Sequence, residues 1–336
     1  MMNLFKLIFV TSMTLGTLMA ISSYSWMGMW IGLEINLFSI IPLINMKKNT
    51  LSSEASMKYF MTQALASTIL MFSIIFLSMN FLFNIKMPLY LMIILNSALL
   101  TKMGAAPFHF WFPEIMMGLN WTNSMIMLTW QKIAPFMLIL YSNKLLTFMI
   151  IIITSNMIIS GFMGMNQINL QKIMTYSSIN HMGWMLTSIL FSEMIWIIYF
   201  IIYSILTINI TWLFKNLSIF TLKQLYININ NPTIKFFFAL NFLSLGGLPP
   251  FLGFLPKWMT IQLLINNKMM LTSMMMVMMT LITLYFYTRI TFTSIILKTN
   301  EINFYKKSSL KNMSLWMINF YSIMGLIIST TLYNMM

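Results

Sequence analysis

The sequence predicts an all-α polytopic membrane protein with about eleven transmembrane helices, and three observations support this. Hydrophobic residues make up 59% of the 336 residues and charged residues 7%, whereas a soluble domain carries roughly 25% charged residues. A transmembrane helix requires about 20 apolar residues, and the chain contains eleven separate apolar runs of about that length. The connecting loops are short, so we expect a single transmembrane domain over residues 1–336.

The apolar runs are too long and too continuous for strands, so each is predicted to be a helix. In chain order they cover residues 4–21, 24–45, 59–79, 87–106, 122–142, 146–164, 174–191, 194–214, 236–265, 270–297 and 313–333. The first run has no arginine-rich presequence and a second span follows it at once, so we do not expect a cleaved signal. Aromatic residues near span ends, such as Trp26, Tyr59 and Tyr333, are typical of an interfacial belt.

The charges are few and mostly basic: 18 Lys, one Arg, five Glu and no Asp, for a net charge of +14. Such an excess can indicate binding to nucleic acid or to a membrane surface. Here the lysines stand singly between apolar runs, so we interpret them as topology signals. One side of the membrane, with the N-terminus and the even-numbered loops, collects Lys6, Lys47, Lys48, Lys58, Lys172, Lys215, Lys223, Lys235, Lys298, Lys306, Lys307 and Lys311; the other collects Lys86, Lys144 and Lys268. The N-terminus is therefore predicted on the positive side and the C-terminus on the opposite side.

A short motif occurs twice, in or after the fourth and ninth runs. Residues 107–114 read Pro-Phe-His-Phe-Trp-Phe-Pro-Glu and residues 250–257 read Pro-Phe-Leu-Gly-Phe-Leu-Pro-Lys, each preceded by glycine. Two prolines six residues apart and a glycine cannot continue a regular helix, so both places are predicted to be broken helices. Because the copies lie five spans apart, an odd number, we expect the two units to which they belong to be oppositely oriented. Broken helices in inverted repeats indicate an ion or substrate site near the membrane midplane.

Several ionisable residues fall within the predicted spans, where a charge is costly and usually functional. Glu34 and Lys132 lie at the centres of their runs, while Lys102 precedes the first break and Lys257 ends the second. Burial disfavours the charged form of Lys and Glu, and a neighbouring opposite charge favours it. A lysine whose partner is near in one state and distant in another can therefore load and release a proton. The alternative is a static ion pair that fixes helix packing, but three deep lysines and one deep glutamate favour transport.

The other polar residues of the spans leave alternatives open. Arg289 lies near the end of its run and is interpreted as an anchor, and Glu114 is either a helix-terminus anchor or a pathway residue. His109 lies in the first break and His181 in the middle of 174–191. Lone histidines are more often structural than functional. Two histidines also allow a b-type haem, although haem helices usually carry more, and a Soret band in purified material would reveal one.

Other kinds of site are missing from the sequence. The chain has no Cys, which excludes a disulfide framework, an iron–sulfur cluster and a thiolate metal site. It has neither a P-loop nor a Gly-x-Gly-x-x-Gly motif that opens a helix. No Ser-His-carboxylate set has a credible location, and the 40 Met are interpreted as lipid-facing or core residues. We therefore expect no cofactor and no metal in this chain.

Four stretches resemble the chain 2 family of NADH:ubiquinone oxidoreductase, respiratory complex I, and the similarity runs over essentially the whole chain. Residues 30–36 (Trp-Ile-Gly-Leu-Glu-Ile-Asn) match the family's acidic second helix, residues 102–111 with Pro113 and Glu114 its first broken helix, residues 176–184 its seventh helix, and residues 246–254 with Pro256 and Lys257 its second broken helix. The Met-rich composition without Asp or Cys is similar to that of insect or related invertebrate members.

The resemblance implies an antiporter-like fold of two inverted five-helix units plus a final helix. It implies a core membrane subunit that translocates protons across the mitochondrial inner membrane, with the N-terminus in the matrix and the C-terminus in the intermembrane space. NADH, FMN, iron–sulfur clusters and ubiquinone would be bound by partner subunits. The partners would be other membrane-arm subunits and the lipid bilayer, without nucleic acid.

The resemblance also implies roles for individual residues. Glu34 would pair electrostatically with Lys102, Lys132 would be the central lysine, and Lys257 the terminal lysine toward the far side. His109 and His181 would lie along the same polar axis.

Two other functions remain open at this point. The chain could be a structural scaffold, in which case lysine variants would fail in assembly rather than in turnover. It could also be a stand-alone cation/proton antiporter, and ion flux from the isolated chain in liposomes would support that.

Overall fold

The computed structural model describes residues 2–45, 49–83, 88–142, 145–228, 232–249, 251–296 and residue 325. These residues form helices joined by short connections, and no strand occurs within them. The predicted final helix, 313–333, lies outside the described residues except for residue 325. Also outside them are Pro250 and eight of the lysines used to predict sidedness: Lys47, Lys48, Lys86, Lys144, Lys298, Lys306, Lys307 and Lys311.

The chain divides into two compact units, Met1–Ile152 and Ile153–Met336. Unit 1 contains α1 (Met2–Ser22), α2 (Trp26–Asn45), α3 (Thr50–Phe83), α4 (Pro88–Met103), α5 (Trp111–Gly118), α6 (Trp121–Leu128) and α7 (Trp130–Tyr141). The boundary falls within α8 (Leu146–Met165). Unit 2 continues with α9 (Leu170–Phe191), α10 (Glu193–Leu217), α11 (Leu222–Asn228), α12 (Pro232–Gly246), α13 (Phe254–Asn266) and α14 (Met270–Ile296).

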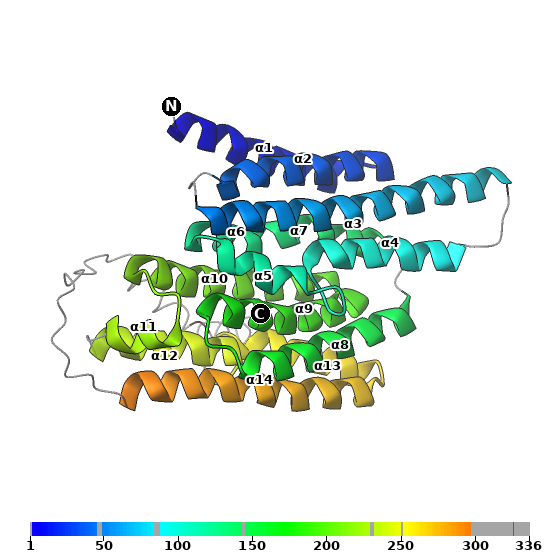
Figure 1. The fold of residues 1–336 in the computed structure, drawn as a ribbon. Coiled ribbons are helices and arrows are strands. Elements are labelled where there is room, and N and C mark those ends of the chain that lie inside the picture. Colours follow the sequence, from blue (N-terminus) through cyan, green and yellow to red (C-terminus); the bar gives the residue numbers. More distant parts are fainter. Residues whose placement is uncertain are drawn as a thin grey trace. The chain divides into compact units, whose positions relative to one another are not determined.

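In unit 1, α1 and α2 lie side by side (Figure 1). Small residues make this approach possible, because a Cβ atom added at Gly32 would lie 2.5 Å from the backbone nitrogen of Ala20 and 2.8 Å from the carbonyl oxygen of Gly16. Close backbone contact through small residues is a common way for membrane helices to pack. Helix α3 packs against α2, α4 and α5, and α7 packs against α1 and α4. Helix α2, which carries Glu34, is thereby held between α1 and α3.

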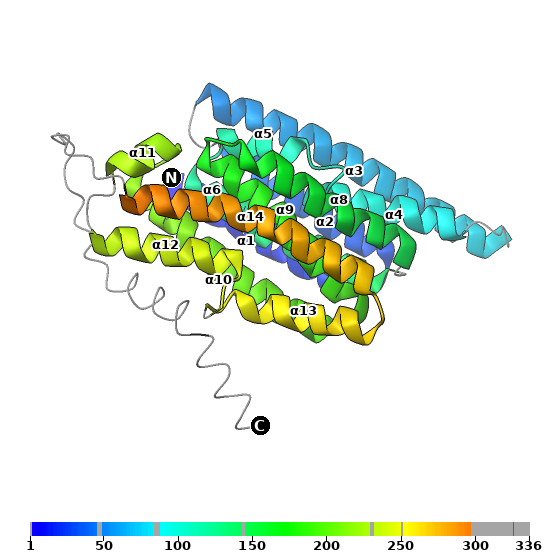
Figure 2. The ribbon, with the colours of Figure 1, turned by 90° about the horizontal axis from the view of Figure 1, so that it is seen from below.

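In unit 2, α9 is the central helix, and almost all of its residues are buried. It packs against α10, α13 and α14, while α12 packs against α10 and α14. Figure 2 shows α12 and α13 as two separate helices. The polar side chains of α9 therefore face other helices rather than lipid, which removes the cost of exposing them to hydrocarbon.

Within the described residues, seven helices are long and apolar enough to cross a membrane. The expected runs 87–106, 174–191 and 236–265 fall on α4, α9 and the α12–α13 pair, which are shorter or more polar than those seven. The count of eleven spans therefore stays a prediction. Helix α3 begins at Thr50, nine residues before the expected run, because Glu54 and Lys58 interrupt the apolar pattern without ending the helix.

Candidate functional site

The first predicted helix break is present between α4 and α5. Helix α4 ends in a turn at Gly104, whose φ of 75° is the left-handed conformation that glycine adopts without strain. In this turn the N–H of Gly104 donates to the carbonyl of Thr101 (3.1 Å), and the N–H of Ala105 to that of Leu100 (3.0 Å). The indole N–H of Trp111 also donates to the carbonyl of Thr101, at 3.1 Å.

Lys102 lies in the last turn of α4 and is buried, with 7% of its surface exposed. Glu34, half-buried on α2, lies close enough for its negative charge to attract the Lys102 ammonium. The two side chains do not form a direct ion pair in the described structure, where the ion pairs within 4.0 Å join Lys58 to Glu54 and to Glu114. The Oε1 atom of Glu34 is buried and accepts no hydrogen bond from the described residues.

Helix α3 supplies two polar side chains, Gln63 and Tyr59, that no sequence pattern marked as site residues. The amide of Gln63 donates to the carbonyl of Lys102 at 3.3 Å. Tyr59 lies one helical turn before Gln63 and is close enough to Glu34 to interact with its charge. The Tyr59 ring lies 6.0 Å from the Trp111 ring. Tyr59 is 4% exposed, so its assignment to an interfacial belt is wrong. The error follows from the start of α3, because the helix begins at Thr50 and Tyr59 lies inside it rather than at its end.

Lys132 is the most deeply buried of the three site lysines, with 1% of its surface exposed. It lies in the first turn of α7, just after the helical span 121–141 is interrupted at Thr129 and just before Pro135. Its ammonium nitrogen lies 5.5 Å from the centre of the Phe112 ring on α5, a cation–π contact. The neighbouring Gln131 donates to the side-chain oxygen of Asn36 at 3.0 Å, which ties α7 to the helix that carries Glu34.

His109 lies in the connection between α4 and α5 and is 2% exposed. Its Nδ1 atom is 3.3 Å from the carbonyl oxygen of Pro107, and its ring lies 4.5 Å from that of Phe110. Unit 1 therefore places Glu34, Lys102 and Lys132 on packed helices and His109 in the connection that forms the first break.

In unit 2, His181 lies at the centre of a buried polar cluster that the sequence did not reveal. Its Nδ1 atom is 2.9 Å from the hydroxyl of Tyr199, and its ring lies 5.1 Å from that of Tyr203, both on α10. Tyr203 lies beside Ser178, and Tyr287 of α14 lies beside Ser177. The tyrosines had no signal in the sequence, because their runs are apolar and only the packing of α10 and α14 on α9 brings the hydroxyls together.

The second predicted break is present between α12 and α13. Its turn has the same form as the first: the N–H of Gly247 donates to the carbonyl of Ser244 (3.0 Å), and that of Leu248 to Leu243 (3.4 Å). Gly247 has a φ of 76°. Lys257, in the first turns of α13, is 7% exposed, and its ammonium donates to the carbonyls of Gly246 (2.7 Å) and Leu245 (3.4 Å).

Glu114 is exposed in the first turn of α5 and lies 3.0 Å from Lys58. Of its two interpretations, this placement favours an anchor, since a carboxylate near a helix N-terminus is favourable. Arg289 is half-buried on α14.

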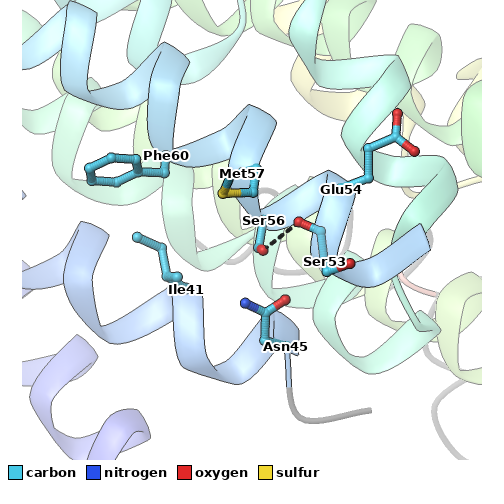
Figure 3. A pocket seen from close by; sticks show the side chains of 7 residues that line it. All are labelled: Ile41, Asn45, Ser53, Glu54, Ser56, Met57 and Phe60. Carbon is cyan, nitrogen blue, oxygen red and sulfur yellow. Dashed lines mark hydrogen bonds between the residues drawn. The ribbon is translucent and has the colours of Figure 1, made fainter. Parts of the chain in front are cut away.

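A surface groove of about 790 Å³ lies between the end of α2 and the start of α3, lined by Ile41, Asn45, Ser53, Glu54, Ser56, Met57 and Phe60 (Figure 3). None of the predicted site residues lines it. The described residues contain no group of three His, Cys, Asp or Glu side chains placed to hold a metal ion.

Comparison with known proteins agrees with this architecture. Residues 23–283 match the family model described as the transmembrane region of NADH:quinone oxidoreductase and Mrp antiporters. The chain is 48% identical to NADH-ubiquinone oxidoreductase chain 2 of Anopheles gambiae over 98% of both chains, and 49% identical to that of Aedes aegypti over 97% of both. A chain of respiratory complex I from Thermus thermophilus superposes with a TM-score of 0.86 at 20% identity, over 97% of this chain and 78% of that one. The chain therefore belongs to the NADH:quinone oxidoreductase/Mrp antiporter family and, within it, to the group of NADH-ubiquinone oxidoreductase chain 2.

Proposed function

We propose that the chain is a proton-translocating membrane subunit of respiratory complex I in the mitochondrial inner membrane. The identity of 48% and 49% to two insect chain 2 proteins, over nearly the full length of each chain, supports the assembly and the location. In this proposal NADH oxidation and ubiquinone reduction take place in partner subunits, and this chain holds no redox centre and no cofactor. Its N-terminus lies in the matrix and its C-terminus in the intermembrane space, as the lysine bias predicts.

The observation that carries the proposal is the burial of ionisable side chains at two helix breaks. Lys102 and Lys257 are each 7% exposed, and Lys132 is 1% exposed, in helices made mostly of apolar residues. A cation buried in a membrane protein is costly, and such residues commonly mark ion pathways. Protons pass along Glu34, Lys102, Lys132 and Lys257, with His109 and His181 on the same polar axis. Lys and Glu suit this role because both change charge, which Arg does not.

The two helix breaks also support a repeat in the chain. The turns at Gly104 and Gly247 have φ values of 75° and 76° and the same pair of hydrogen bonds, and both precede the repeated motif by three residues. Two inverted five-helix units, approximately 1–145 and 146–297, together with the final helix 313–333, form one transmembrane domain in this proposal. Inverted repeats with broken helices are the usual framework of a transport pathway.

Variants of Lys132, assembled into the complex, test the proposal. Lys132→Ala removes the charge, while Lys132→Arg keeps the charge but cannot release a proton. We expect both to lower the number of protons pumped per NADH in proteoliposomes, and Lys215→Ala, which removes an exposed lysine on α10, to leave it unchanged. A native gel stained for NADH oxidation, with mass spectrometry of the active band, verifies assembly.

Each outcome of this experiment discriminates between functions. Normal pumping by an assembled Lys132→Ala complex would contradict the proposal. Full pumping by Lys132→Arg with none by Lys132→Ala would mean that the lysine acts as a fixed charge. Loss of assembly in all Lys132 variants would favour a scaffold, and finding the chain only in a smaller, inactive species would favour a separate antiporter.

A further inference from the structure

We propose that the two carbonyl groups that end α12 form a seat for the Lys257 ammonium, and that Gly247 is the positioning residue that makes room for it. This inference rests on the proposed function, because it concerns how one pathway lysine is held. The Lys257 ammonium donates to the carbonyl of Gly246 at 2.7 Å and to that of Leu245 at 3.4 Å. Its side chain reaches back from α13 across the break to the preceding half-helix.

The sequence explains why these two carbonyls are available. In a continuous helix the carbonyls of Leu245 and Gly246 would accept from the N–H groups of residues 249 and 250. Both of those residues are proline, which has no N–H. The turn at Gly247 satisfies the carbonyls of Leu243 and Ser244 instead. The break therefore leaves two carbonyl oxygens at the end of α12 to be satisfied by another donor, and the ammonium of Lys257 is in contact with both.

Gly247 makes the seat in two ways. Its φ of 76° closes the turn without strain, as only glycine does readily. Its missing side chain also leaves the path of the lysine open. A Cβ atom at this position would lie 2.8 Å from Cδ, 3.1 Å from Cε and 3.0 Å from Nζ of Lys257. Any side chain at residue 247 would therefore displace the ammonium from the carbonyls or move the whole turn.

The first break holds its lysine differently. There the carbonyls of Thr101 and Lys102 accept from two neutral donors, Trp111 and Gln63, and Lys102 is attracted to the carboxylate of Glu34. In unit 2 the described residues include one carboxylate, Glu193, which is exposed at the start of α10. The C-terminal end of a helix carries a partial negative charge of about half an elementary charge. The C-terminal end of α12 thus supplies the negative charge near Lys257 that the Glu34 carboxylate supplies near Lys102.

The difference between a carboxylate partner and a carbonyl partner affects proton transfer. A carboxylate can take up the proton of a neighbouring lysine, whereas an amide carbonyl accepts the hydrogen bond without taking the proton. While the Lys257 ammonium donates to the carbonyls of Leu245 and Gly246, it keeps the proton that it would otherwise transfer. Transfer then requires the side chain to leave α12 and reach water or a further acceptor. The seat therefore controls when Lys257, the terminal lysine of the proposed pathway, can exchange its proton.

The test compares glycine variants in the assembled complex, with protons pumped per NADH and yield of complex as readouts. Gly247→Ala is expected to lower pumping several-fold. Gly161→Ala is the matched control, because its Cβ would meet Ile282 at an ordinary distance of 3.5 Å on a regular helix. Both glycine variants are repeated with Lys257→Ala, which removes the side chain that the new methyl group would meet.

If Gly247 acts through Lys257, Gly247→Ala lowers the protons pumped per NADH in the parent background and lowers them no further in the Lys257→Ala background. The strain of a residue other than glycine at a φ of 76° lowers the yield of complex in both backgrounds, so the deciding readout is pumping by the assembled complex. An equal further loss of protons pumped per NADH in both backgrounds would mean that Gly247 serves only the turn, and the inference would be overturned. It would also be overturned if Lys257→Ala lowered pumping while Gly247→Ala behaved like Gly161→Ala. Normal pumping by Lys257→Ala would instead remove Lys257 from the proposed pathway, which is a failure of the proposed function.

Discussion

The contact between α1 and α2 gives the most direct prediction of a structural cost. A methyl group at Gly32 would lie 2.5 Å from the backbone nitrogen and 2.8 Å from the Cα of Ala20, and 2.8 Å from the carbonyl oxygen of Gly16. Ordinary contact begins near 3.4 Å, so Gly32→Ala requires the two helices to separate by about 0.9 Å. All three obstructing atoms belong to the backbone, and no rotation of a side chain relieves the overlap.

Overpacking typically costs about 1–3 kcal/mol. Since only a movement of whole helices relieves this overlap, we expect a cost near the upper end, about 3 kcal/mol. That corresponds to roughly a hundredfold change in the equilibrium between packed and separated helices. The change also moves α2 at a point two residues from Glu34, so the attraction between Glu34 and Lys102 should weaken.

The assay is the rate at which the assembled complex loses NADH:quinone activity on heating, together with its yield on a native gel. Gly32→Ala should be inactivated faster than the parent and recovered in lower yield. Gly161→Ala introduces the same methyl group into α8 with contacts of 3.5 Å or more, and should resemble the parent. Equal inactivation rates for Gly32→Ala and the parent would refute the close approach of α1 and α2.

Two further predictions concern the first helix break. Trp111→Phe keeps a six-membered aromatic ring but removes the indole N–H that donates to the carbonyl of Thr101, which should cost about 1 kcal/mol of stability. The rate of thermal inactivation measures this cost, and Trp258→Phe, at a half-exposed tryptophan, is the control. Equal inactivation rates for the two variants would contradict the prediction. Glu114→Gln removes one partner of the exposed Lys58 ion pair, and exposed pairs contribute little. Pumping and stability should therefore stay near the parent values, and a marked fall in protons per NADH would instead identify Glu114 as a pathway residue.

The helix breaks were predictable because their causes are local. Proline lacks an N–H and glycine adopts a positive φ, so the motifs at residues 107–114 and 250–257 interrupt helices wherever those helices pack. The deep burial of Lys102, Lys132 and Lys257 was predictable for a similar reason, since each lies within a long apolar run. The near-identical turns at Gly104 and Gly247 follow from the same local chemistry.

The partners of these residues were decided by tertiary structure alone. No pattern in the sequence placed Phe112 beneath Lys132, Tyr199 beside His181, or the end of α12 against Lys257. Each of these contacts depends on how far one helix is rotated and shifted against another, which is determined by packing between residues distant in the chain. Tyr59 illustrates the limit, because its burial depends on where α3 begins and on which helices cover it. The sequence by itself therefore determined where charge is buried and where helices break, and the packing of the helices determined what each charge faces.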